Sequence, residues 1–229
     1  MTFVSHPIFL IFLTFFFFLL AKILQNKTGF FLLNPILLTI FALIAFLQCF
    51  DIEYSTYEKA GDFIAFWLQP AVVALGVPLY LQLEKIKEQW LPILLSQLVG
   101  CVVGIVSVVL LAQLFGASRE VVLSLAPKSV TTPIAMEISS VIGGIPSLTV
   151  ATVVCTGLFG ALAGIQIVRI SRIKSEEARG LSIGTASHAV GTSAAMEVSP
   201  IVGAYSSLGL TLNGILTAIL TPIIVPMLV

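Results

Sequence analysis

Two pairs of polar or charged side chains recur at a spacing of 60 residues in this sequence. Lys128 and His188 form one pair, and Glu137 and Glu197 form the other. Both pairs lie in stretches that otherwise consist mostly of apolar and small polar residues. Because lysine and histidine side chains donate hydrogen bonds to anions, the first pair predicts a binding site for a small carboxylate.

The two pairs belong to a longer internal repeat. Residues 119–148 align with residues 179–208 without a gap, and 11 of the 30 positions are identical. The identities include an Ala-Met-Glu triplet at 135–137 and again at 195–197. They fall on Glu, Met, Ser and Thr rather than only on Leu and Val. A shared apolar character therefore does not explain the match.

Each copy of the repeat is interrupted at the same place. The interruption is Pro-Lys-Ser-Val-Thr-Thr-Pro at 127–133 and Ser-His-Ala-Val-Gly-Thr-Ser at 187–193. A helix rises 1.5 Å per residue, so the pieces on either side of each break are too short to cross a bilayer. We expect the second pieces to begin near Thr132 and near Thr192 or Ser193, with Thr or Ser as N-caps. Both helix N-termini would then direct free N–H donors towards one buried anion site.

The composition indicates that this site lies inside a membrane. Of the 229 residues, 58% are hydrophobic and 10% are charged, and the mean hydropathy is +1.11. A soluble domain of this size cannot hide so much apolar surface. The net charge of zero offers no argument for nucleic-acid binding. The fold class predicted is therefore all-α and integral to the membrane.

About six transmembrane helices and two broken segments fit this length. The spans predicted in residues 1–115, a four-helix scaffold region, are 7–24, 31–50, 63–81 and 91–115. Loops are expected at 51–62 and 84–88, and Pro70 and Pro78 should bend the third span. Residues 116–229 form the repeat region, with copies at 117–170 and 177–229, and the whole chain is interpreted as one membrane domain.

The predicted site consists of the polar side chains at the two breaks. The substrate-binding candidates are Lys128, Ser129, Thr131, Thr132, His188, Thr192 and Ser193. Glu137 and Glu197 have two interpretations, because a carboxylate at membrane depth must be paired or protonated. They either couple transport to protons or lock the broken segments by pairing with Lys128, His188 or backbone donors.

Other polar and small residues have structural interpretations. Ser139, Ser199, Asn213 and Thr217 should form interhelical hydrogen bonds, and the pairs Gly100/Gly104 and Gly160/Gly164 should allow close helix packing. Cys49, Cys101 and Cys155 are isolated and are expected to be buried as small apolar residues. We expect no metal site, no cofactor and no enzymatic activity, since HExxH and GxSxG motifs do not occur.

The distribution of basic residues predicts how the broken segments cross the bilayer. Each segment could re-enter on the face it came from or cross as a discontinuous helix. With the N-terminus outside and re-entry, eight of the eleven lysines and arginines lie inside. Crossing would place the most basic loop, 171–179, outside, against the positive-inside rule. Re-entry makes the two copies inverted repeats, an architecture of transporters, and places both termini outside.

The motifs at the breaks resemble the LrgB/CidB family. They are Ala-Pro-Lys-Ser-Val-Thr-Thr-Pro-Ile-Ala at 126–135, Ala-Ser-His-Ala-Val-Gly-Thr at 186–192, and the two Ala-Met-Glu triplets. The resemblance covers essentially the whole chain, although residues 1–115 match mainly in span layout. It implies a protein of the bacterial inner membrane that acts with a small LrgA- or CidA-type partner.

The resemblance implies two functions. Some members are described as holin-like or antiholin-like regulators of murein hydrolase export and autolysis. Others resemble carriers of small monocarboxylates such as pyruvate, glycolate or glycerate. A basic residue at the same position of each break favours a carrier, because a protein that forms membrane lesions needs no buried anion site. A purely structural subunit, for which neutral replacements at Lys128 and His188 would be silent, is a third possibility, and a homodimer would bury more surface.

Overall fold

The computed structural model describes residues 3–28, 33, 35–67, 70 and 76–229, and all of its regular elements are helical. The chain forms two compact units, Met1–Ala74 and Leu75–Val229. This boundary differs from the predicted division at residue 115. The helix that forms the fourth predicted span belongs to the second unit, together with both copies of the repeat.

The first unit contains three helices. They are α1 (Pro7–Thr28), α2 (Pro35–Cys49) and α3 (Tyr54–Ala65), preceded by a single 3-10 turn at Phe3–Ser5. Rings on α1 and α2 pack together, with the Phe9 and Phe46 centroids 6.2 Å apart. The α3 helix contacts α1 through the Thr14 and Tyr57 hydroxyls, which lie 3.2 Å apart.

Two segments predicted as charged loops are helical, so those predictions were wrong. Residues 51–62 largely form α3, and residues 84–88 form α6 (Leu83–Glu88). In α3 the less exposed residues Tyr57, Ala60 and Ile64 recur at helical spacing, while the acidic residues lie on the other side. The many charged residues in 51–62 favoured a loop prediction over this helical periodicity. The predicted bend of the third span lies mostly outside the described residues.

The second unit contains the remaining helices. They are α5 (Gly76–Leu81), α6, α7 (Trp90–Leu114), α8 (Arg119–Leu125), α9 (Thr132–Ile142), α10 (Pro146–Ile170), α11 (Glu176–Met196) and α12 (Pro200–Ile224), followed by a 3-10 turn at Val225–Met227. Four described helices of the chain are long and apolar enough to span a bilayer: α1, α7, α10 and α12 with its final turn. An all-helical membrane protein is thereby confirmed.

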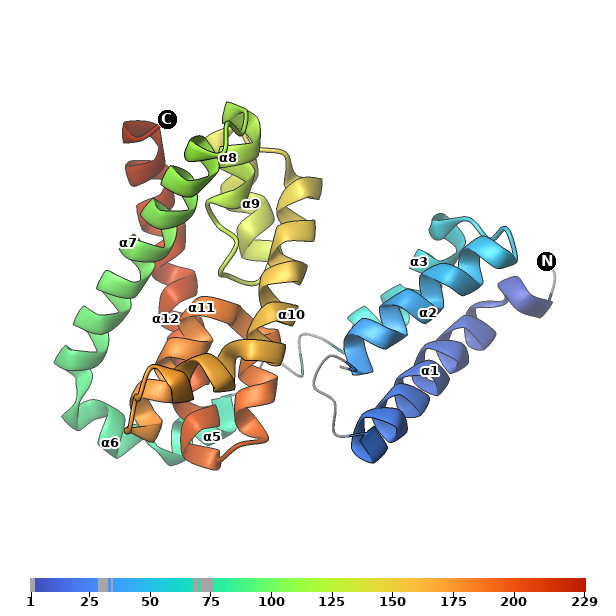
Figure 1. The fold of residues 1–229 in the computed structure, drawn as a ribbon, viewed down its shortest axis with the longest axis horizontal. Coiled ribbons are helices and arrows are strands. Elements are labelled where there is room, and N and C mark those ends of the chain that lie inside the picture. The colour runs from blue at the N-terminus through green and yellow to red at the C-terminus, as the bar shows by residue number, and fades with distance from the viewer. Residues whose placement is uncertain (1–2, 29–32, 34, 68–69, 71–75) are drawn as a thin grey trace. The chain divides into compact units, whose positions relative to one another are not determined.

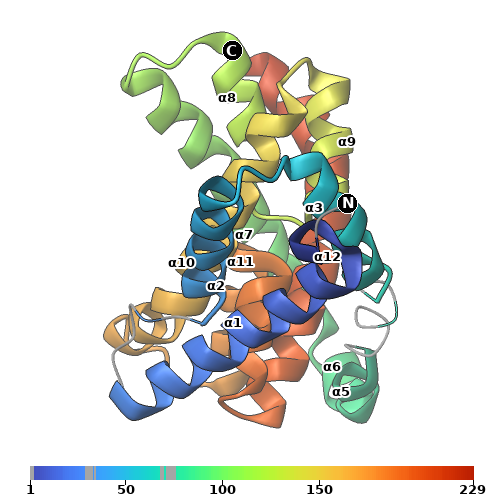
Figure 2. The ribbon, with the colours of Figure 1, turned by 90° about the vertical axis from the view of Figure 1, so that its right-hand side faces the viewer.

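The two broken segments, 119–144 and 179–204, have their outer ends at opposite ends of the second unit. In Figures 1 and 2, α8 and α9 occupy the end where α7 finishes, and α5 and α6 lie at the other end. The Thr149 hydroxyl at the start of α10 donates to the Ser124 carbonyl of α8 at 3.0 Å. The start of α12 meets the start of α11, where the Ser199 hydroxyl donates to the Glu176 carboxylate at 3.3 Å. Each broken segment therefore begins and ends at the same end of the unit.

The first broken segment follows the predicted pattern. Its first helix, α8, ends at Leu125, and α9 begins at Thr132 as expected, with Thr131 as the N-cap residue and Pro133 in the first turn. The α9 helix ends at Gly143, whose φ of 87° suits a residue without a Cβ. The Ile145 amide then donates to the Ser124 hydroxyl at 2.7 Å, which holds the end of the segment against α8.

The second broken segment resumes its helix earlier than predicted. Within α11 only Ser187 and His188 have non-helical φ/ψ, so the expected start near Thr192 or Ser193 was wrong. Proline flanks the break in the first copy, at 127 and 133, but serine occupies the equivalent positions 187 and 193. Serine retains its backbone N–H, so the helix can form again directly after His188.

Small residues bring α11 close to its neighbours. A Cβ at Gly184 would overlap the Ser206 carbonyl oxygen of α12, and a Cβ at Gly160 of α10 would overlap the Ser187 side chain. Close packing is thus confirmed at Gly160. It is also confirmed at Gly100, where a Cβ would lie 3.3 Å from the Thr185 side chain, whereas a Cβ at Gly104 would meet no heavy atom within 4 Å.

Gly184→Ala and Gly104→Ala form a matched test of this packing. We expect Gly184→Ala to destabilise the protein by about 1–3 kcal/mol, since the new methyl group would meet backbone that cannot rotate away. Gly104→Ala should be neutral or stabilising by up to about 1 kcal/mol, because alanine favours a helix and has room there. Thermal unfolding of the detergent-solubilised proteins measures both. Equal midpoints would contradict the packing described here.

Candidate functional site

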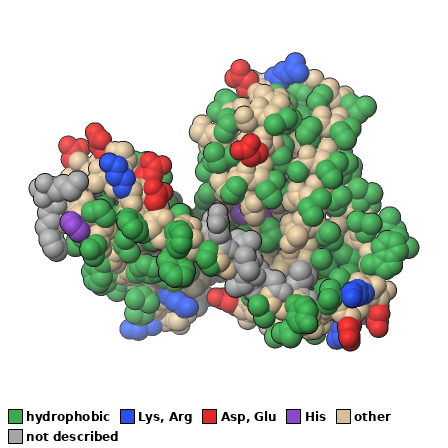
Figure 3. Space-filling view, turned by 180° about the vertical axis from the view of Figure 1, so that it is seen from behind, with side chains coloured by type: hydrophobic (Ala, Val, Ile, Leu, Met, Phe, Trp, Pro, Cys, Tyr) green, Lys and Arg blue, Asp and Glu red, His purple; other side chains and the backbone are tan. Residues whose placement is uncertain are grey.

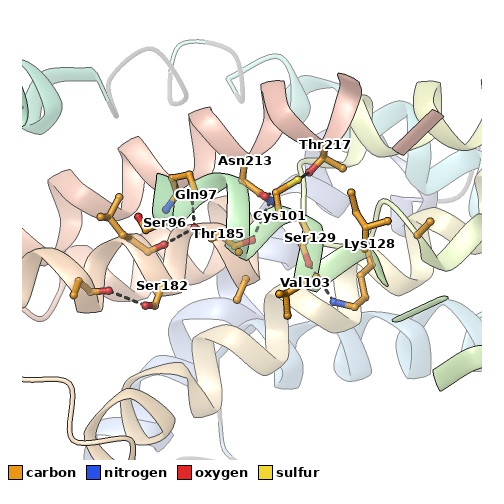
Figure 4. A pocket seen from close by; sticks show the side chains of 17 residues that line it. Ser96, Gln97, Cys101, Val103, Lys128, Ser129, Ser182, Thr185, Asn213 and Thr217 are labelled. Atoms are coloured by element: carbon orange, nitrogen blue, oxygen red, sulfur yellow. Dashed lines mark hydrogen bonds between the residues drawn. The ribbon is translucent and has the colours of Figure 1, made fainter. Parts of the chain in front are cut away.

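One side chain on α12 joins the two breaks. The Nδ2 atom of Asn213 donates to the Ser129 carbonyl at 3.1 Å and to the Thr185 carbonyl at 3.0 Å. Ser129 lies in the first break, and Thr185 lies two residues before the second. Asn213 is only 2% exposed, and its Oδ1 atom accepts from Thr217 at 3.4 Å. Its amide therefore satisfies backbone carbonyls from both copies of the repeat at once (Figure 4).

A cavity of about 410 Å³ opens beside this junction, between α7, α11, α12 and the first break. Its volume lies within the usual range of small-molecule sites. Figure 4 shows the side chains around it, which come from both sides of Asn213. The polar side chains among its lining residues are Ser96, Gln97, Lys128, Ser129, Ser182, Thr185, Asn213 and Thr217.

Lys128 is the one basic residue among the described residues that line this cavity. Its Nζ atom donates to the Ser129 hydroxyl at 3.1 Å, which uses one of the three donors of an ammonium group. Lys128 also lines a second cavity of about 570 Å³ between α10 and α11. The two cavities share Lys128, Ser182 and Ala186. The lysine thus lies where both cavities meet.

His188 lies in the core of the second unit rather than in the lining of either cavity. It is 4% exposed, and its Nε2 atom is 2.9 Å from the Val153 carbonyl oxygen of α10. Its backbone has φ 45° and ψ −144°, a region in which residues other than glycine are strained. Such a conformation persists only where packing enforces it, and the contact with Val153 helps to hold the break.

The remaining predicted binding residues are spread along the two breaks. Thr131 and Thr132 are partly buried at the start of α9. Thr192 is buried, donates to the His188 carbonyl at 2.8 Å and lies 2.9 Å from the Ser206 hydroxyl. Ser193 is exposed and donates to the Ala189 carbonyl. Of the predicted binding residues, the structure brings only Lys128 and Ser129 to the first cavity.

The two glutamates are exposed on the second unit. Glu137 lies in α9, and Glu197 follows the last residue of α11. Neither lines a cavity described above. The hydrogen bond of Lys128 goes to Ser129, and that of His188 goes to Val153. The structure therefore offers no pairing of these glutamates with the two basic residues.

Sequence reasoning did not identify the contribution of α7 to the cavity. Gln97 of α7 is 2% exposed, and its Oε1 atom lies 2.6 Å from the Thr185 hydroxyl of α11. A glutamine inside a long apolar helix was the available signal, because such a residue needs a hydrogen-bonding partner. Ser96, Ser182 and Thr185 carried no signal of their own.

Several predicted packing roles are confirmed. The Thr149 and Ser139 hydroxyls lie 2.7 Å apart, and the Thr217 hydroxyl lies 3.3 Å from the Cys101 sulfur. Together with Asn213 and Ser199, these residues form interhelical hydrogen bonds. Burial is confirmed for Cys101 but not for Cys49 and Cys155, which are exposed.

Comparison with known proteins assigns the chain to a family. The sequence profile of the LrgB-like family matches residues 14–227. The chain belongs to the LrgB-like family. It is 38% identical to the holin-like protein CidB of Staphylococcus aureus over 209 residues, which cover 91% of this chain and 90% of the relative. The holin-like protein CidB of Staphylococcus epidermidis is 36% identical over 224 residues, 98% of this chain and 96% of the relative.

A Haemophilus influenzae protein named only as uncharacterized is 40% identical over 208 residues, covering 91% of this chain and 90% of the relative. No solved structure matches the sequence. The family and the long apolar helices make this LrgB-like protein a multi-pass membrane protein. The names of its relatives fit a membrane regulator or transporter rather than an enzyme.

Asn213→Leu tests whether the amide holds the two breaks together. Without it, the Ser129 and Thr185 carbonyls lose their shared donor, which should favour local opening by about 1–3 kcal/mol. Cys101 lies beside Thr217 and is 3% exposed, so its modification by a maleimide reports such opening. With Cys49 and Cys155 replaced by serine, we expect the modification rate to rise about five- to 150-fold, as measured by mass spectrometry.

Thr211→Val is the matched control for this experiment. Among the described residues, the Thr211 hydroxyl bonds only the Ser207 carbonyl of its own helix, so its loss should leave the Cys101 rate unchanged. Equal rates in the Asn213 and Thr211 variants would show that Asn213 does not hold the junction closed.

Proposed function

We propose that this LrgB-like protein carries small monocarboxylates, of the pyruvate, lactate, glycolate or glycerate class, across the bacterial inner membrane. The observation that carries the proposal is the position of Lys128 at the meeting point of two cavities on different sides of α11. An ammonium group there can bind a carboxylate that enters through either cavity. Chemically, this is the arrangement that a carrier needs, because its site must be reachable from each side in turn.

The arrangement of the repeat supports the same proposal. One broken segment begins and ends at one end of the second unit, and the other begins and ends at the opposite end. Asn213 bonds backbone carbonyls at or beside both breaks. Transporters with inverted repeats bind substrate where broken helices meet near the middle of the membrane. Movement of one copy against the other could then open the cavities alternately.

We further propose that both broken segments re-enter the membrane. Non-helical backbone at membrane depth is tolerated where protein or a water-filled cavity satisfies it, as Asn213 does here. The end of the second unit formed by α6, the end of α10 and the start of α11 would face the cytoplasm. It contains six of the unit's eight lysines and arginines: Lys85, Lys87, Arg169, Arg172, Lys174 and Arg179.

The surface of the second unit fits a body that spans the bilayer. Its charged side chains gather mainly at the two ends, and apolar side chains dominate between them (Figure 3). The C-terminus lies at the end opposite the basic one, where the Gln113 side chain donates to the Leu228 carbonyl at 2.8 Å. The proposal places this terminus, and the N-terminus, outside.

Single cysteines at positions 87, 120 and 174 test the orientation. In a chain without natural cysteines, re-entry predicts that Lys87→Cys and Lys174→Cys are protected from an impermeant maleimide added to intact cells, while Glu120→Cys is labelled. If the first broken segment crossed the membrane instead, positions 87 and 174 would lie on opposite sides. Labelling after the cells are opened confirms that each cysteine is reactive.

A second candidate function follows from the names of the relatives. Proteins called holin-like at 36–38% identity favour a holin-like role. The family resemblance extends this role to the regulation of murein hydrolase export and autolysis. Such a role would involve leakage or partner binding rather than selective exchange. It is compatible with carboxylate transport, because a flux of acid changes cytoplasmic pH and metabolism.

Counterflow in liposomes separates the two functions. We expect the purified protein to exchange labelled pyruvate, lactate or glycolate saturably and to retain a co-trapped dye. Lys128→Gln should reduce exchange at least tenfold, because it removes the charge that binds the carboxylate. Lys174→Gln, in the loop before α11, should leave exchange unchanged. An imposed pH gradient would show whether protons move with the acid, as a role for Glu137 or Glu197 requires.

Dye release without selective exchange would contradict the carrier and favour the holin-like role. If neither exchange nor dye release occurs, the same assay with a small LrgA- or CidA-type partner decides whether the second protein is required. Full exchange by Lys128→Gln would show that the lysine is not the binding group. Crosslinking in the liposomes reports whether the active form is a homodimer.

A further inference from the structure

Gln97 occupies the part of the first cavity away from Lys128. In Figure 4 it lies with Ser96 and Thr185 on one side of Asn213, while Lys128 lies on the other. The side chain is 2% exposed, yet it lines the cavity. A glutamine so deeply buried in an apolar helix requires hydrogen-bonding partners for both ends of its amide.

The described residues supply a hydrogen-bonding partner for only one end of this amide. The Thr185 hydroxyl lies 2.6 Å from Gln97 Oε1 and 2.7 Å from the Leu181 carbonyl oxygen. A hydroxyl has a single hydrogen, so Thr185 either donates to Gln97 or donates to Leu181 and accepts from the other end of the amide. In both arrangements one amide atom of Gln97 has no protein partner among the described residues. That atom is not sealed in the core and therefore faces the cavity.

We propose that Gln97 determines specificity by hydrogen-bonding an uncharged polar group, a hydroxyl or keto oxygen, of the acid whose carboxylate binds Lys128. This proposal rests on the proposed carrier function and defines its substrate more narrowly. An amide can donate through Nε2 or accept through Oε1, so it suits either group. An acid with only methylene groups beyond its carboxylate would leave that amide atom without a partner.

The Gln97 amide is held in place by Thr185 before any substrate binds, which favours discrimination between acids with and without the polar group. Because the Gln97 amide is already buried and held by Thr185, it loses little conformational entropy when it binds the substrate. A site built to hydrogen-bond a substrate discriminates against analogues that lack the polar group. Because the cavity admits water, we expect a preference of about tenfold or more rather than the extreme values of sealed sites.

Four-carbon acids test the proposal in the liposome assay. Butyrate and 2-, 3- and 4-hydroxybutyrate differ only in the presence and position of one hydroxyl group. We expect at least one hydroxy acid to compete for exchange about tenfold better than butyrate. Gln97→Met keeps the size of the side chain and leaves Thr185 bonded to the Leu181 carbonyl. It should abolish the preference while butyrate competes as before.

Gln113→Met is the matched control, because it removes the other described glutamine of α7, which lies outside the cavity. This variant should keep the preference for the hydroxy acid. Equal competition by butyrate and all three hydroxy acids in the unmodified protein would overturn the role of Gln97 and leave the carrier intact. An equal loss for every acid in Gln97→Met would also overturn it, since the residue would then only support the fold. Absence of exchange with any acid would overturn both proposals together.

Discussion

The second unit of this protein depends on pairing the backbone groups that two broken helices release in apolar surroundings. Unpaired carbonyl groups are unfavourable there, and no water from a bilayer interior can satisfy them. Asn213 donates both hydrogens of its amide to carbonyls from the two copies of the repeat. Asn213 therefore holds the two broken helices together, and the first cavity lies beside that junction.

Around this junction, glycines mark both the places where helices pack closely and a place where a cavity remains. Gly184 brings α11 against the α12 backbone, and Gly160 admits Ser187, so the helices touch there. Gly104 faces open space instead and lines the first cavity. The same residue type thus produces close packing or a cavity, according to what lies opposite. A pair of glycines four residues apart in one helix does not show what lies opposite each of them.

The chemistry of the site follows from this division. One group of polar side chains surrounds Lys128, and another surrounds Gln97, with Asn213 between them. The cation suits a carboxylate, and the amide suits a neutral oxygen. The α11 helix lines both of the cavities that share Lys128. Membership in the LrgB-like family is compatible with a carrier and with a holin-like regulator.

The sequence by itself determined the membrane environment, the repeat and the start of α9, because composition, spacing and proline act locally. It also indicated hydrogen bonding by Asn213 but not the partners. Only the tertiary structure decided that His188 packs in the core, that Glu137 and Glu197 are exposed and that Gln97 and Thr185 complete the cavity. These outcomes depend on contacts between helices that are distant along the chain. The direction in which a side chain points is decided by its neighbours, and periodicity within one helix leaves those neighbours unspecified.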